Sequence, residues 1–506
     1  MPMAKQLSKS DYLMYLRHPA WLWLKKNDPA KLPPVDDNQQ AIFDQGNLFE
    51  SVVEQRYAGL IRLGFDNYQE YLSLPKRTAE ALQRGERLIA QARFEAGPIT
   101  CICDVIEQGQ DGQLDLVEIK ASTSVKTDHI DDLAFQVVVL QDAGYSVGKI
   151  SVIHCNNQYV RHGEIEPDKL AVEVDVSERV LNTLDKTRQQ IDQALAVMAQ
   201  PDMPDPSPAR ARGYFKDWLQ IYLSLKPPSD DYHIYQICRP NPQLLAELEH
   251  GGISKLADIP DSIALNPQQA RQVEVTRLGQ PVVHQTKIDK FLGGFSYPLY
   301  FLDYETLASV LPPFDGLRPY QQLPFQYSLH VVDGPEAPPR HLEYLHTSPD
   351  APGPGLLAQL QRDIGPSGSV VVWYADFERG CNSLMAELWP LYAVFLQDVN
   401  DRVVDLMEPF ARGWYMHCDF YGSASIKKVL PVLVPELSYK ALDIQEGASA
   451  QRLWMQAVLG GAKADQQQLF ANLRRYCELD TLAMVKIYQA LRGKPKPSQL
   501  SIFDQA

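Results

Sequence analysis

The segment between residues 99 and 120 restricts the fold of this chain more than any other. Residues 99–106 alternate between apolar and polar side chains, a Gly/Asp turn follows at 108–112, and residues 114–120 form a second extended run. Two runs of period two that are joined by a short polar turn are typical of a β-hairpin. Both strands of the hairpin carry acidic residues, so the pattern predicts a sheet on which carboxylates from adjacent strands lie close together.

Helices are expected on either side of this hairpin. Residues 78–92 combine good helix formers with spaced apolar positions, and residues 177–198 form a long amphipathic pattern with Ser177 as its N-cap. Four prolines between residues 201 and 208 end that helix and mark a domain boundary.

A second α/β pattern follows in the C-terminal half. It contains an extended run at 297–305, a β-rich run at 369–374 and a long helix at 466–491. A chain of 506 residues needs more than one hydrophobic core. The expected organisation is an N-terminal domain (1–205), a connecting region (206–295), a C-terminal domain (296–493) and a tail (494–506).

Composition excludes several classes of protein. A hydrophobic fraction of 45% and a charged fraction of 22% describe a folded globular chain. There is no run of 18 apolar residues and no signal-peptide pattern, so we expect a cytoplasmic protein without a membrane partner. The seven cysteines are odd in number and lie mostly in apolar runs, which favours reduced, buried thiols.

The net charge of −15 argues against a protein that coats nucleic acid without specificity. The overall charge is compatible with a local basic groove, because salt screens the interactions between charges that lie more than roughly 8 Å apart. Carboxylates that hold metal ions also count as negative in such a sum.

The hairpin brings a first set of catalytic residue types together. Glu118 and Lys120 lie two apart and therefore share one face of a strand, and Asp104 lies on the adjacent strand. Carboxylates bind Mg²⁺ through oxygen, the metal activates water for phosphodiester hydrolysis, and a lysine stabilises developing charge. The tripeptide Glu-Ile-Lys by itself is more often a solvated strand face.

The order Asp, hairpin turn, Glu-x-Lys resembles the core of the RecB-like PD-(D/E)XK nucleases. Residues 7–19 resemble the opening helix of that group, residues 46–50 resemble its motif I, and residues 132–136 resemble its glutamine-bearing helix. The resemblance implies a restriction-endonuclease-like fold with Mg²⁺ or Mn²⁺. It implies metal ligands at Glu50, Asp104 and Glu118 and catalytic roles for Lys120 and Gln136.

One departure concerns the iron–sulfur cluster that many of these relatives carry. Its cysteines lie near the opening helix and near the end of the domain. Here residues 16–19 and 200–237 contain no cysteine, so no iron–sulfur cluster is expected.

A second acidic set lies in the C-terminal half. Asp303 and Glu305 share a strand face, Asp376 follows an apolar strand, and Tyr476 and Asp480 lie one helical turn apart. Each piece alone is common, and an Asp on a helix is usually solvated. Carboxylates beside strongly apolar strands nevertheless need partners or a metal, because an unpaired buried charge is costly.

Four acids in this order, ending in Tyr-x-x-x-Asp, resemble the DEDD exonucleases of the RNase H-like fold. The resemblance implies two metal ions about 3.5–4 Å apart, held by Asp303, Glu305, Asp376 and Asp480, with Tyr476 orienting the attacking water. The segment around Asp376 lacks the asparagine often found upstream, and Asp405 is the substitute candidate.

The whole chain also resembles a bacterial family of open function that joins these two modules. Residues 422–431 and 437–447 are similar to its signatures. Lys427 and Lys428 are candidates for contacts with a nucleic-acid backbone, although an exposed lysine pair is usually only solvated.

No P-loop, paired Cys/His zinc pattern or Gly-x-Ser-x-Gly motif is present in the sequence. The leading interpretation is an α/β DNA nuclease with two modules, the second a 3′→5′ exonuclease. It would act on single strands or ends in repair, recombination or defence. The alternatives are a DNA-binding adaptor in which one or both sites are inactive, and an RNA exonuclease.

The tail contains a candidate partner-binding motif. Two prolines at its start favour an extended chain, and Gln499-Leu500-Ser-Ile502-Phe503 resembles the bacterial sliding-clamp-binding peptide. The apolar side chains would fill a pocket while Gln499 fixes their orientation through hydrogen bonds. The alternative is that Ile502 and Phe503 fold back onto the preceding helix.

The tail peptide is therefore expected to bind a purified sliding clamp in a fluorescence-anisotropy titration. The double substitution Gln499→Ala with Phe503→Ala should abolish binding, because it removes the orienting amide and the aromatic anchor. Binding that survives the substitution, or no binding at ~100 µM, a limit of roughly −5.5 kcal/mol, would contradict the assignment.

Overall fold

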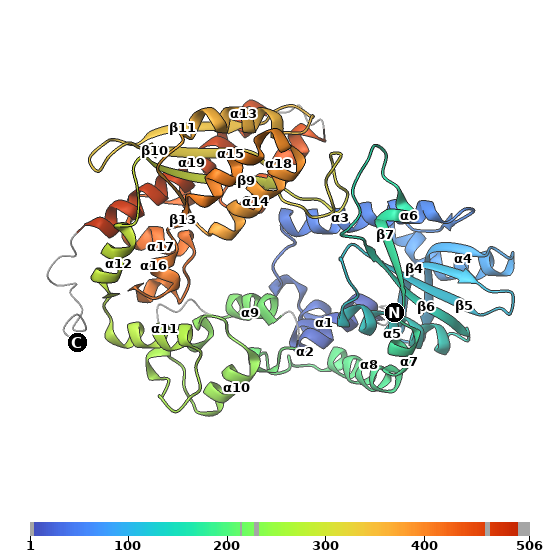
Figure 1. The fold of residues 1–506 in the computed structure, drawn as a ribbon. Coiled ribbons are helices and arrows are strands. Elements are labelled where there is room, and N and C mark those ends of the chain that lie inside the picture. Colours follow the sequence, from blue (N-terminus) through green and yellow to red (C-terminus); the bar gives the residue numbers. More distant parts are fainter. Residues whose placement is uncertain (1–4, 213–214, 227–231, 461–465, 494–506) are drawn as a thin grey trace. The chain divides into compact units, whose positions relative to one another are not determined.

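The chain forms two compact units of mixed α/β structure (Figure 1). The computed structural model describes residues 5–212, 215–226, 232–460 and 466–493. Unit 1 comprises Met1–Pro228, Asn241–Ala246 and Ser309–Tyr320, and unit 2 comprises Ser229–Pro240, Glu247–Ala308 and Gln321–Ala506. The expected connecting region, 206–295, is thus divided between the two units.

Unit 1 is built on a seven-stranded sheet with the order β2-β3-β4-β5-β6-β7, and β1 pairs with β4. β4 and β5 are antiparallel, which confirms the predicted hairpin. β5 and β6 are parallel, so the chain crosses between them through helix α5 (Thr127–Asp142). The strands are β1 (Leu7–Ser8), β2 (Ile61–Arg62), β3 (Leu88–Ala96), β4 (Ile99–Gln108), β5 (Leu114–Lys120), β6 (Val147–Cys155) and β7 (Ala171–Asp175).

Helices cover both faces of this sheet (Figure 1). Leu116 packs with Phe135 of α5 on one face, while Val117 packs with Phe49 and Val53 of α3 on the other. Besides α5, the helices of unit 1 are α1 (Lys9–Arg17), α2 (Pro19–Asn27), α3 (Asp37–Val53), α4 (Tyr68–Gln83), α6 (Pro167–Leu170), α7 (Ser177–Leu181), α8 (Leu184–Ala199) and α9 (Phe215–Ser224).

Two helix predictions were wrong in their extent. The helix expected at 78–92 ends at Gln83, and its last apolar residues belong to β3, where burial in the sheet outweighs helix propensity. The helix expected at 177–198 is divided into α7 and α8. The side chain of Ser177 does not cap it, because its Oγ accepts from Ile150 N at 2.9 Å.

β3 and β4 change face at one paired position. Gln91 has a left-handed φ of 57°, and Ala90 and Ala92 on either side of it pack into opposite apolar clusters. β4 makes the same change at Asp104, which lies between Val105 and Cys103, the partners of Ala90 and Ala92. A strained, irregular strand position often orients a functional side chain.

Unit 2 is built on a five-stranded mixed sheet with the order β11-β10-β9-β12-β13. β10 is antiparallel to both β9 and β11, while β12 is parallel to β9 and to β13. The extended runs predicted at 297–305 and 369–374 correspond to β9 and β12. The strands are β9 (Leu299–Leu307), β10 (Leu323–Val332), β11 (Arg340–Leu345), β12 (Ser369–Val372) and β13 (Val403–Asp405), with a separate pair β8 (Val282–Val283) and β14 (Tyr415–Met416).

The long helix α19 (Gln466–Arg492) crosses this sheet and is fixed to β10 by polar contacts. Gln326 Nε2 donates to Leu473 O at 3.0 Å, and the hydroxyls of Ser328 and Thr481 lie 2.7 Å apart. The remaining helices are α10 (Pro242–His250), α11 (Pro267–Leu278), α12 (Gln285–Leu292), α13 (Gly353–Asp363), α14 (Ala375–Leu388), α15 (Ala393–Asp401), α16 (Glu408–Ala411), α17 (Ile426–Leu433) and α18 (Gly447–Val458).

In the described part of the chain, none of the helices combines the length and the apolar character needed to cross a membrane. All seven cysteines are free, and five of them are buried, as the sequence predicted.

Candidate functional site

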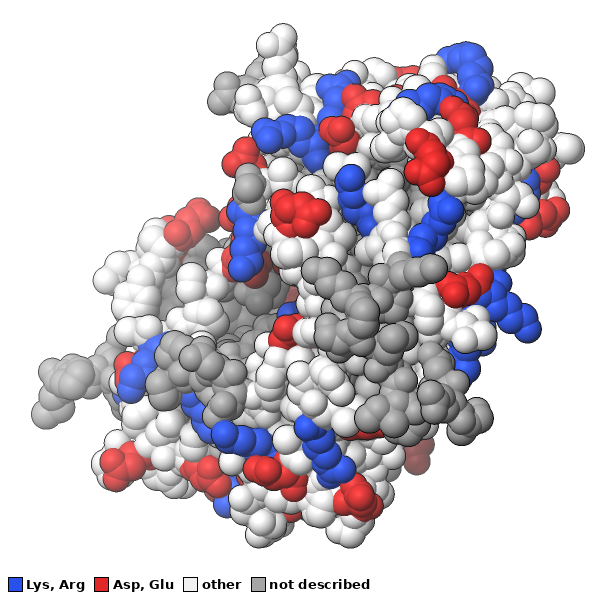
Figure 2. All heavy atoms as spheres, turned by 90° about the vertical axis from the view of Figure 1, so that its left-hand side faces the viewer, with Lys and Arg blue, Asp and Glu red and all other residues white. Residues whose placement is uncertain are grey.

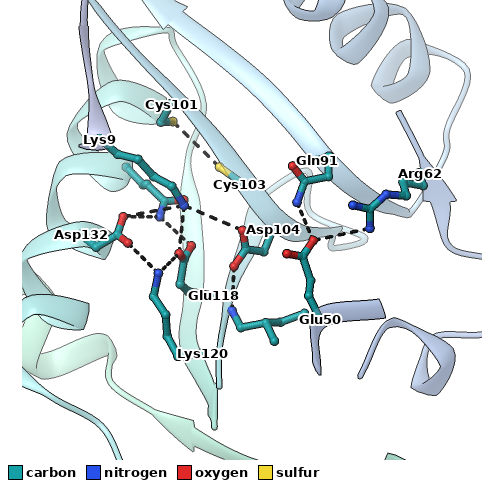
Figure 3. A network of polar contacts seen from close by, with 12 residues as sticks. Lys9, Glu50, Arg62, Gln91, Cys101, Cys103, Asp104, Glu118, Lys120 and Asp132 are labelled. Carbon is teal, nitrogen blue, oxygen red and sulfur yellow. Dashed lines mark hydrogen bonds and ion pairs between the residues drawn. The ribbon is translucent and has the colours of Figure 1, made fainter. Parts of the chain in front are cut away.

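Unit 1 contains a buried polar cluster, which we call the first centre (Figure 3). The predicted residues Asp104, Glu118, Lys120 and Gln136 are brought together there, and two further residues join them. The first centre consists of Lys9, Asp104, Glu118, Lys120, Asp132 and Gln136.

Glu118 lies at the middle of the first centre and is fully buried. Its Oε1 accepts from Lys9 Nζ at 2.9 Å and from Lys120 Nζ at 2.5 Å, and its Oε2 accepts from Gln136 Nε2 at 2.7 Å. Burial and the neighbouring Asp104 oppose ionisation of Glu118, but the two lysines prevail and hold its pKa below the usual value. Glu118 is therefore a carboxylate at neutral pH.

Helix α5 contributes two side chains one turn apart, Asp132 and Gln136. Asp132 accepts from Lys120 and from Gln136, each at 2.9 Å. Gln136 Oε1 is buried without a hydrogen-bond partner among the described residues. Asp132 was missed at the level of sequence, although its spacing of four residues from Gln136 places both on one helix face.

Asp104 and Glu50 approach the first centre from other elements. Asp104 accepts from Ile119 N at 2.8 Å, and its pKa is raised by burial despite the nearby lysines. Glu50, on α3, accepts from Gln91 Nε2 at 2.6 Å. Burial raises the pKa of Glu50, and repulsion from Glu118 adds to the effect, so Glu50 lies within electrostatic range of the centre without joining its hydrogen bonds.

Unit 2 contains a second acidic cluster beside a cavity of about 430 Å³. Asp303 and Glu305 point from β9 toward α19, which contributes Tyr476, Cys477 and Asp480. Cys477 Sγ lies 3.8 Å from Asp303 Oδ2. The cavity is lined by these carboxylates together with Trp373, Phe377, Lys427, Gly447, Gln451 and Tyr476, among others.

These carboxylates have few counter-charges. Burial raises the pKa of Asp303 and of Glu305 well above the usual values. Repulsion from Asp480 adds to both shifts, and repulsion from Asp303 adds to that of Glu305. Burial also raises the pKa of Asp480 to about 6, against the effects of Tyr439, Lys427 and Tyr476. Such a cluster is expected to take up a cation or protons.

Asp376 was predicted as the third acid, but it is exposed and does not line the cavity. Two residues further along α14, Glu378 is buried and its Oε2 has no partner in the described part of the chain. Burial, Asp303 and Glu305 raise the pKa of Glu378 well above its usual value. Residues two apart on a helix point to opposite sides, so only one of these acids can face the sheet.

The substitute candidate, Asp405, has a structural role. Its carboxylate accepts from the backbone N–H groups of Tyr374, Ala375 and Met407 at 2.9–3.1 Å, which fixes the start of α14. We therefore define the second centre as Asp303, Glu305, Glu378 and Asp480.

The two signature segments, 422–431 and 437–447, form one wall of the second centre. Tyr439 donates its hydroxyl to Asp480 Oδ1 at 2.5 Å. Lys427 Nζ donates to Gln445 O at 2.6 Å and lies 5.6–5.7 Å from the ring centres of Tyr476 and Tyr439. Gly447 lies beside the Glu305 carboxylate, since a Cβ added there would be in van der Waals contact with Glu305 Oε2 at 3.5 Å.

Lys427 and Lys428 therefore have different surroundings. Lys427 points into the cavity, and Lys428 is exposed, with its Nζ 5.2 Å from the ring centre of Tyr421. On the face drawn in Figure 2, Lys and Arg side chains are interspersed with Asp and Glu. The proposed clamp motif, Gln499 to Phe503, lies outside the described residues.

Comparison with known proteins gives a local match to a family and two distant relatives. A domain of unknown function (DUF2779) matches residues 300–425, a stretch that includes Asp303, Glu305 and Glu378 but not Asp480. The uncharacterized protein MG366 homolog of Mycoplasma pneumoniae is 29% identical over 210 residues, covering 37% of this chain and 31% of that protein. The uncharacterized protein MG366 of Mycoplasma genitalium is 26% identical over 222 residues, covering 40% of this chain and 33% of that protein.

The chain thus spans about a third of the length of these curated relatives. The match to the domain begins at the second residue of β9 and extends past β13, so it includes all five strands of the sheet of unit 2. Two acids of the second centre, Asp303 and Glu305, lie on these strands.

The substitution Asp480→Asn should stabilise the metal-free protein at pH 8, by about 3 kcal/mol. The pKa of Asp480 is about 6 in the folded chain and 3.8 ordinarily, so folding disfavours its charged form. Wild-type stability therefore falls as the pH rises from about 4 to about 6, and the advantage of Asn should be absent at pH 4. Urea unfolding at pH 4 and pH 8 measures the difference in unfolding free energy between the variant and the wild type. Asp376→Asn, at an exposed position, is the control. Equal effects of Asp480→Asn at both pH values would contradict the prediction.

Proposed function

We propose that this chain is a divalent-metal-dependent nuclease that cleaves DNA at two centres, of which the second is a 3′→5′ exonuclease. The observation that carries the proposal is the second centre. Four carboxyl groups come together from β9, α14 and α19; Glu305, Glu378 and Asp480 are buried and Asp303 is half-buried. Asp303, Glu305 and Asp480 line one cavity, where Lys427 offsets part of their charge. Burying so much like charge is costly unless a cation binds there.

The donor atoms of the second centre suit Mg²⁺ or Mn²⁺. Ligand atoms of Asp303, Glu305 and Cys477 lie within 4.8 Å of one another. Mg²⁺ and Mn²⁺ prefer hard oxygen ligands to a soft thiolate, so the carboxylate oxygens are the donors in this proposal rather than Cys477 Sγ. Glu378 Oε2, which is buried without a partner, adds another oxygen. Metal ions held there would supply an activated water and neutralise charge on the phosphate.

The other residues of the cavity have distinct roles in this proposal. Burial raises the pKa of Tyr476, so it remains a hydroxyl that can donate to or orient a water molecule in the cavity. Tyr439 holds Asp480 in place through its hydrogen bond. Lys427 reduces the repulsion among the carboxylates, since it lowers the pKa of Asp303, Glu305 and Asp480.

The architecture of unit 2 supports the same assignment. Three antiparallel strands are followed by two parallel ones, in the order β11-β10-β9-β12-β13. This order suits the RNase H-like fold that the sequence resembles. The Tyr-x-x-x-Asp pair lies on the helix that packs against the acidic strand, as a DEDD-type exonuclease requires.

Unit 1 is proposed to hold a PD-(D/E)XK centre of the RecB-like type. Asp104 and Glu118 are the metal-binding carboxylates on adjacent strands, with Glu50 as a further acid. Lys120 and Gln136 orient the attacking water and hold Glu118. The unpartnered Gln136 Oε1 offers an additional oxygen at the same place. Clamp binding through the tail would direct this nuclease to DNA in repair, recombination or defence.

The substitutions Glu118→Ala and Asp303→Ala should remove two separable activities, because the two acidic sets lie on different sheets. End-labelled single- and double-stranded DNA and RNA are incubated with Mg²⁺ or Mn²⁺ and wild-type or variant protein. Asp303→Ala should abolish 3′→5′ degradation, and Glu118→Ala should abolish a second pattern of cleavage.

Three results would change the assignment. If one substitution abolished every cleavage of every substrate, the two-centre model would fail. If neither changed anything, or the wild type cleaved nothing, a DNA-binding adaptor would explain the chain better. Degradation of RNA in preference to DNA would indicate an RNA exonuclease.

Glu378→Gln should reduce the 3′→5′ activity by about 100-fold or more, because an amide cannot replace a charged oxygen donor in a metal site. Asp376→Asn is the matched control, an acid on the same helix that is exposed. It should keep activity within about twofold. If Asp376→Asn lost activity in a single-turnover assay while Glu378→Gln retained it, the third metal-binding acid would be Asp376 rather than Glu378.

A further inference from the structure

Lys9 occupies a place in the first centre that the proposed chemistry does not use. Its Nζ lies 2.9 Å from Glu118 Oε1, 3.8 Å from Asp104 Oδ1 and 3.9 Å from Asp132 Oδ1 (Figure 3). Lys120, the lysine of the Glu-x-Lys motif, pairs with Glu118 and Asp132. Among the described residues, Lys9 is the cation within 4 Å of both Asp104 and Glu118.

The backbone fixes Lys9 in this position. β1 pairs with β4 so that Leu7 lies opposite Ile99 and Ser8 opposite Thr100. Ser8 and Asp11 then form a capping box that starts α1 at Lys9. Leu7 and Tyr12, on either side, are fully buried in the core of unit 1. Lys9 therefore enters the first centre from an ordered strand-to-helix junction.

The charges at this point are nearly balanced without a metal ion. Asp104, Glu118 and Asp132 are three carboxyl groups, and Lys9 and Lys120 are two ammonium groups in contact with them. A divalent ion bound by Asp104 and Glu118 would need the oxygens that face Lys9. The lysine and the ion cannot both hold them at full strength, because like charges a few ångströms apart repel.

We propose that Lys9 is a resident counter-cation of the first centre, which holds Asp104 and Glu118 together and competes with the divalent ion for their oxygens. The inference rests on the proposed metal-dependent function of this centre. Lys9 is thus a positioning residue. Its removal should destabilise the metal-free centre and increase the affinity for the metal ion. Loss of a residue with a purely structural role would instead lower that affinity.

The test measures Mn²⁺ binding to the full chain by isothermal titration and electron paramagnetic resonance. All proteins carry Asp303→Asn and Asp480→Asn, so that the second centre does not contribute. At low ionic strength, Lys9→Met should bind Mn²⁺ about tenfold more tightly than the parent, since one competing charge is gone. Its thermal midpoint should be below that of the parent in EDTA and should rise more on addition of Mn²⁺.

The chain offers a matched control and two further variants. Lys26 is as buried as Lys9, with side-chain exposures of 17% and 21%, and pairs with Asp11 at 2.6 Å outside the first centre. Lys26→Met should leave Mn²⁺ affinity unchanged. Lys9→Gln, which keeps a polar side chain, should tighten binding as Lys9→Met does. Lys9→Arg retains the charge and should not tighten it.

The outcomes separate this inference from the proposed function. If Glu118→Gln abolishes Mn²⁺ binding while Lys9→Met and Lys9→Gln bind no more tightly than the parent, counter-cation competition is wrong and the metal centre stands. If the parent binds no Mn²⁺, or binds it independently of Glu118, both the competition and the proposed metal site of unit 1 are wrong.

Discussion

Compensation of buried carboxylates is the constraint on which both candidate sites are built. A carboxylate removed from water loses hydration worth several kcal/mol, and a cation or a set of hydrogen-bond donors must replace it. Unit 1 buries Glu118 completely, and unit 2 buries Glu305, Glu378 and Asp480 to more than nine-tenths. The elements around each site either supply cations and hydrogen-bond donors to these carboxylates or leave space in which a cation can bind.

The two centres meet this constraint in different ways. In the first, two lysines and the Gln136 amide occupy both oxygens of Glu118, and the pKa of this carboxyl is lowered. In the second, one lysine is shared among several acids, and the pKa values of these acids are raised. The first centre is therefore internally neutralised, whereas the second depends on protons or a bound cation. Their sensitivity to pH and to metal should differ accordingly.

The second centre is completed by chain segments that lie outside the stretch matching the domain of unknown function. That stretch supplies the sheet and the acids Asp303, Glu305 and Glu378. Tyr439 and Gly447 come from the segment that follows, and Asp480 comes from the last helix. Tyr439 fixes Asp480, and Gly447 lines the cavity beside Glu305. A fragment limited to residues 300–425 would hold the acidic strand without the groups that position the fourth carboxylate.

Local sequence pattern determined the hairpin at 99–120, strands β9 and β12, helix α19 and the acids carried on them, because strand and helix periodicity fix which residues share a face. It did not determine the ends of α4 or the division of α7 from α8, where burial against the sheet competes with propensity. Only the tertiary structure separated buried Glu378 from exposed Asp376, since the direction of α14 relative to the sheet decides which acid is buried. Lys9 meets Glu118 across 109 residues, a contact that strand pairing creates and no local pattern contains.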